Sequence, residues 1–147
     1  MCVIRVGCEE NDFLEIAIAG YTYPVAGDYW DGNWLRVDVK VATGAFRGDV
    51  TGNLRTEELE LFRDQLAALL DTLKGTAEFR TMEEWLSLRV TSDRRGHLTL
   101  AAEIQDEPGI GNTLSCTMEY DQTYFQPMLA ALRLVAERFP VRGERPS

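Results

Sequence analysis

The chain has 147 residues and a formal net charge of −9, with 24 acidic residues against 15 basic ones. This length suits one domain, so we expect a single globular domain over residues 1–147. The acidity argues against direct binding of nucleic acid or of an anionic membrane surface, because phosphate contacts need clustered Lys and Arg. No long apolar run and no basic, apolar leader is visible, and three scattered cysteines suit reduced thiols. We therefore expect a cytoplasmic protein without a membrane segment.

Four strands are predicted in the first part of the chain, at 2–8, 14–19, 33–42 and 46–54. The third has the clearest pattern, because apolar Leu35, Val37 and Val39 alternate with polar side chains. A period of two residues indicates a strand with one buried face.

A helix follows, because the apolar period changes from two residues to three or four. Its stripe consists of Leu59, Phe62, Leu66, Leu69, Leu70 and Leu73. We expect Thr56 to be the N-cap and Gly75 to lie just outside the C-terminus.

The second part repeats this order. Strands are predicted at 77–79, 85–90, 98–104 and 114–120. A second amphipathic helix is predicted to begin near Thr123 and Gln126, which have the spacing of a capping box, and to stop at Pro140. Residues 141–147 are expected to be a flexible tail.

The predicted order is thus four strands, a helix, four strands and a helix. We expect an α+β fold with a largely antiparallel, curved sheet and both amphipathic helices packed on its apolar face. The alternative is two smaller sheets, one in each half of the chain, each closed by its helix.

The candidate binding residues lie between residues 28 and 34, where aromatic and acidic side chains are concentrated: Asp28, Tyr29, Trp30, Asp31 and Trp34. One interpretation is structural: the aromatics cover the end of a sheet, and Asp31, followed by a glycine, holds a turn while Asp28 is more exposed. The other is a binding patch, because Trp and Tyr are favoured interface anchors.

Catalytic and metal-binding patterns were not found in the sequence. His97 is the one histidine, and the cysteines lack the spacing of zinc ligands. Nucleophile-elbow, dinucleotide-binding and phosphate-loop motifs are also lacking. We expect no enzyme activity, no metal and no cofactor.

The run from Asp28 to Leu35 resembles the signature of the WapI-type immunity protein family. The resemblance implies a small bacterial protein that binds and blocks the C-terminal nuclease domain of a cognate secreted toxin. The expected partner is therefore a basic protein, which agrees with the acidity of this chain. The alternative is a non-catalytic small-molecule or structural binding domain, with the aromatic run as part of a pocket.

Overall fold

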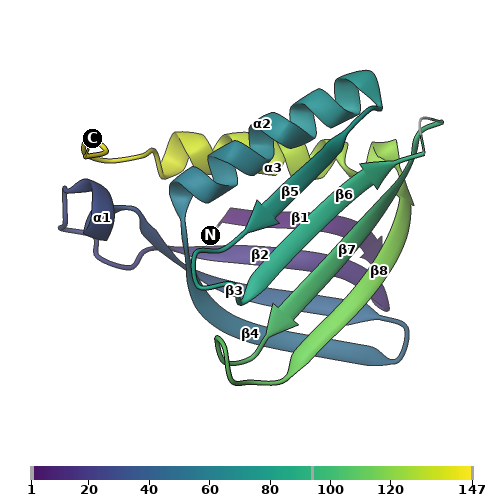
Figure 1. The fold of residues 1–147 in the computed structure, drawn as a ribbon, viewed down its shortest axis with the longest axis horizontal. Coiled ribbons are helices and arrows are strands. Elements are labelled where there is room, and N and C mark those ends of the chain that lie inside the picture. Colours follow the sequence, from purple (N-terminus) through teal and green to yellow (C-terminus); the bar gives the residue numbers. More distant parts are fainter. Residues whose placement is uncertain (1, 94, 147) are drawn as a thin grey trace.

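The computed structural model describes residues 2–93 and 95–146. Within these residues, eight strands and two long helices follow one another in the predicted order, and a short helix, α1, precedes β3 (Figure 1). The elements are β1 (Cys2–Glu9), β2 (Asp12–Tyr21), α1 (Tyr29–Gly32), β3 (Trp34–Thr43), β4 (Phe46–Arg55), α2 (Thr56–Thr72), β5 (Thr76–Arg80), β6 (Leu86–Ser92), β7 (His97–Gln105), β8 (Thr113–Asp121), the 3-10 turn η1 (Gln122–Tyr124) and α3 (Gln126–Arg138).

The strands form two antiparallel sheets, in the orders β1-β2-β3-β4 and β5-β6-β7-β8. The predicted α+β class and element order are confirmed, and the division into two sheets is the alternative stated above. The division has a physical reason: helix α2 separates β4 from β5, so the first series of antiparallel strands ends at β4 and a second series begins at β5. The two sheets then bury their apolar faces in one core that also includes residues of α2 and α3.

Both long helices lie along one side of the two sheets, as Figure 1 shows. α2 packs against edge strand β5, α3 packs against edge strand β1, and the two helices contact each other. Each helix therefore covers the edge of the sheet formed by the other half of the chain. The main prediction had placed both helices on the face of one common sheet. Covering an edge strand also hides its unpaired backbone groups.

The predicted apolar stripe of α2 is confirmed for its buried members, Leu59, Phe62, Leu66, Leu69 and Leu70. Leu73 differs, because it lies just beyond the helix as its C-cap, with a left-handed φ of 56°. The predicted N-cap at Thr56 is wrong by one residue, because Arg55 is the N-cap of α2. The backbone N–H of Arg55 donates a hydrogen bond to the Glu58 carboxylate at 2.7 Å. The Thr56 hydroxyl does not cap the helix and instead donates a hydrogen bond to the Phe139 carbonyl, far away in the sequence, at 2.6 Å.

The start of the second helix also differs from the prediction. The carboxylate of Asp121 accepts from the Thr123 backbone N–H and caps η1, and α3 begins only at Gln126. Pro127 lies in the first turn of α3, where its missing N–H would have had no intrahelical partner anyway. Cys8 is exposed, whereas Cys2 is buried. Within the described ranges, no helix is both long and apolar enough to cross a membrane.

Candidate functional site

Residues 28–33 of the aromatic run form the second half of the loop between β2 and β3, which we call the α1 loop (residues 22–33). Figure 1 shows that it projects from one end of the sheets, near the C-terminus. The single helical turn Tyr29–Gly32 was not predicted, because four residues are too few to show a helical period. Asn33, buried at its end, donates from its side-chain amide to the Tyr29 carbonyl at 2.8 Å and stabilises the turn.

The two carboxylates of the loop have different surroundings. The Asp28 carboxylate accepts a hydrogen bond from the backbone N–H of Asp31 at 3.1 Å, so Asp28 is the N-cap of α1. The expectation that Asp31 holds the turn is therefore wrong. A residue that precedes a helical turn can cap its free N–H groups, whereas one inside the turn points away from them. Both residues are exposed.

The three aromatic side chains also differ in burial. Tyr29 is 8% exposed and Trp30 is 46% exposed, while Trp34 is partly buried at the start of β3. The Tyr29 and Trp30 rings meet edge to face with centroids 4.9 Å apart. Trp30 therefore presents about half of its surface to solvent from a firmly packed position.

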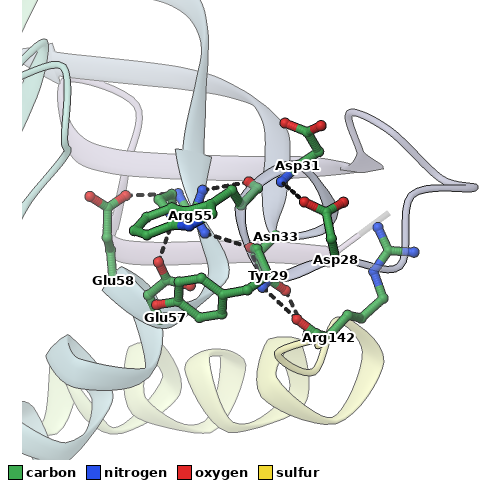
Figure 2. A network of polar contacts seen from close by, with 9 residues as sticks. Asp28, Tyr29, Asp31, Asn33, Arg55, Glu57, Glu58 and Arg142 are labelled. Carbon is green, nitrogen blue, oxygen red and sulfur yellow. Dashed lines mark hydrogen bonds and ion pairs between the residues drawn. The ribbon is translucent and has the colours of Figure 1, made fainter. Parts of the chain in front are cut away.

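Arg55, which the sequence analysis missed, organises this cluster from inside (Figure 2). Its side chain is only 1% exposed, and its guanidinium carbon lies 5.0–5.2 Å from the centroids of the Tyr29, Trp30 and Trp34 rings. It donates hydrogen bonds to the carbonyls of Tyr29 and Trp30, each at 2.8 Å. It also forms an ion pair with Glu57. These contacts satisfy the charge that burial would otherwise penalise.

The pairing of β3 with β4 brings Arg55 to this position. Trp34 and Arg55 are opposite each other at the end of that antiparallel pair. Arg55 follows Leu54 in β4, so strand alternation places its side chain on the face opposite that of Leu54. The α1 loop, however, folds over that face and replaces the solvent.

Burial also shifts the protonation of the neighbouring acidic groups. Loss of solvation raises the pKa of the Glu58 carboxyl to about 7, against the opposing hydrogen bonds from the backbone N–H groups of Arg55 and Met82. Burial, and then the neighbouring Glu57 carboxylate, raises the pKa of the Tyr29 hydroxyl. In this cluster, burial therefore favours the neutral forms of the Glu58 carboxyl and the Tyr29 hydroxyl.

The outer surface of the α1 loop is apolar and acidic. Tyr23 is 51% exposed, Val25 is 100% exposed, and Trp30 lies on the same loop with Asp28 and Asp31. Among the described residues, no group of three or more His, Cys, Asp or Glu side chains is placed to hold a metal ion. The arrangement offers a contact surface, and whether it binds a partner stays a prediction.

The solved structures that resemble this chain have very different sequences. The plant transcriptional regulator PBF-2 has a TM-score of 0.51 and 14% identity, over 89% of this chain and 78% of that chain. Trypanosoma bruciei MRP1/MRP2 has a TM-score of 0.47 and 13% identity, over 94% of this chain and 86% of that chain. At such identities the likeness to PBF-2 concerns the fold alone.

No curated protein matches the chain. The Immunity protein WapI-like family, in contrast, matches residues 5–140, nearly the whole chain and all of the α1 loop. The resemblance carried by residues 28–35 thus extends over both sheets and both long helices, and the chain belongs to the WapI-like immunity protein family.

Proposed function

We propose that this protein binds the C-terminal nuclease domain of a cognate secreted toxin in the cytoplasm and neutralises it by occlusion. Membership of the WapI-like immunity family carries the proposal, because it implies a toxin as the partner. Immunity proteins need no chemistry of their own, and we propose that this one is not an enzyme and uses no cofactor.

The α1 loop is the proposed contact surface. Trp30 offers a half-exposed aromatic face, and exposed Asp28 and Asp31 flank it in sequence. Large aromatic anchors dominate the energy of many interfaces. Tyr29 and Trp34 support this surface from inside, since both pack against Arg55 and the Tyr29 ring also contacts the Trp30 ring.

Charge complementarity supports a basic partner. The chain has a formal net charge of −9, and nucleases carry positive charge where they hold phosphates. An acidic inhibitor is attracted to such a surface and approaches it faster at low ionic strength.

Co-expression tests the proposal. Bacteria that produce the C-terminal domain of the toxin encoded beside this gene should survive when this chain is produced with it. A binding-deficient variant, Trp30→Ala, serves as the matched control once its folding is verified. Cell death at full expression of the wild-type chain would rule out the immunity function and leave the alternative of a structural or small-molecule binding domain.

A further inference from the structure

The C-terminal segment 139–143 lies against the α1 loop, although residues 141–147 were expected to form a flexible tail. The Tyr21 hydroxyl donates to the Pro140 carbonyl at 2.7 Å, and the Thr56 hydroxyl holds the Phe139 carbonyl. Strand β2 and helix α2 therefore both anchor the chain immediately before Arg142. Mobility of the residues beyond this segment stays a prediction.

Arg142 ties together the two ends of the loop. Its guanidinium donates to the carbonyl of Gly32 from Nε (2.8 Å) and Nη2 (2.6 Å). The same group donates to the carbonyls of Pro24 (2.9 Å) and Tyr23 (3.0 Å), and it lies 3.7 Å from the centroid of the Tyr21 ring. One cation thus binds carbonyls from the beginning and the end of the loop.

The backbone around Arg142 adds a second connection. Its N–H donates to the side-chain oxygen of Asn33 at 2.8 Å, and its carbonyl accepts from the side-chain nitrogen of Asn33 at 2.9 Å (Figure 2). Gly143 follows with φ +73°, and a Cβ there would lie 2.7 Å from the Tyr29 backbone nitrogen. Only glycine allows this backbone conformation at such a close approach.

The α1 loop needs such an external hold. A single helical turn has too few hydrogen bonds to be stable alone. A loop that had to become ordered on binding would lose affinity through conformational entropy, whereas a pre-ordered loop avoids that cost.

We propose that the C-terminal segment latches the α1 loop into a rigid projection that enters a concave, basic surface of the toxin domain, with Arg142 as the positioning residue. This inference rests on the proposed function for the identity of the partner. The projection of the loop, its exposed Tyr23, Val25 and Trp30, and its charge support it. Residues 22–33 contain two aspartates and no lysine or arginine. A negatively charged projection complements a positively charged cleft, the usual form of a substrate site.

Arg142→Ala tests the latch by two measurements. Hydrogen exchange of the backbone amides in 22–33 should become at least about tenfold faster, while the amides of β6 and β7 keep their rates. The affinity for the C-terminal domain of the toxin encoded beside this gene should fall at least about tenfold. Loss of a positive charge makes the chain more acidic and should speed association with a basic partner, so weaker binding would not be a charge effect.

Two variants serve as controls. Arg142→Lys keeps the charge but loses the planar fork of donors, so it should restore the loop only partly. Arg145→Ala removes the same charge from an exposed position nearby, so it should leave the exchange rates of the loop unchanged and should not weaken binding.

If the backbone amides of the α1 loop exchanged as slowly in Arg142→Ala as in the wild-type chain, the proposed latch would be refuted. Faster exchange with unchanged affinity would overturn the link between the latch and the partner. A wild-type chain that does not bind the toxin domain would remove the proposed function and its interface together, while the exchange rates would still decide the latch.

Discussion

Replacement of Arg55 by methionine removes the charge at the centre of the aromatic cluster and keeps an unbranched, flexible side chain. The guanidinium has an ion pair with Glu57, hydrogen bonds to two carbonyls and three aromatic rings around it. We expect this substitution to be one of the most destabilising in the chain outside the apolar core.

The expected loss of folding stability follows from the partners of Arg55 that would lose their contact. The Glu57 side chain is 27% exposed, so its charge would remain largely buried without its partner. Removal of one member of a buried ion pair costs about 3–5 kcal/mol. The Tyr29 carbonyl keeps the Asn33 amide as a donor, whereas the Trp30 carbonyl loses the guanidinium. Because such contributions overlap, we expect about 3–5 kcal/mol in total, which lowers the melting temperature by about 6–20 °C.

Urea denaturation followed by circular dichroism measures this loss. A double-mutant cycle with Glu57→Gln isolates the ion pair, because glutamine leaves no charge behind. The double variant should recover about 1–3 kcal/mol relative to the sum of the single variants. A loss below about 1 kcal/mol for Arg55→Met, or additive single effects, would refute the assignment of Arg55 as the organising charge.

The remaining predictions concern the core, the proposed interface and pH. Leu66→Ala should cost about 2–5 kcal/mol in thermal or urea unfolding, because Leu66 is fully buried; an unchanged melting temperature would contradict this. Trp30→Ala should cost about 1–3 kcal/mol of folding stability, since half of the ring is already exposed, but about 2 kcal/mol or more of partner affinity in calorimetry. Asp28→Ala removes the N-cap of α1 and should lower thermal stability at any salt concentration, whereas Asp31→Asn should slow association at low salt, as stopped-flow kinetics can show. For Glu58, the folded pKa of about 7 exceeds the ordinary 4.5, so the folded state binds more protons and stability should fall as pH rises through that window. Glu58→Gln should weaken this pH dependence in urea titrations, and an unaltered slope would contradict it.

The amino-acid sequence determined the elements whose signal is local. Alternation around Val37 and Val39 predicted β3, and the spacing of Leu59, Phe62 and Leu66 predicted α2; the structure contains both. These periods follow from backbone geometry, which repeats every two residues in a strand and every 3.6 in a helix, whatever the rest of the chain does. The compact run at residues 28–35 likewise carried the family resemblance.

Tertiary structure decided how these elements meet and which polar groups become buried. Arg55 was not singled out by any local pattern, although the α1 loop buries it, and Arg142 fell in a segment expected to be a tail. The division into two sheets, with each long helix on the opposite edge strand, has no local signature either. The environment of a charged side chain is set by groups that are far away in the sequence. Here Arg55 and Arg142 both bind carbonyls of residues near 30, so their roles become visible only in the folded structure.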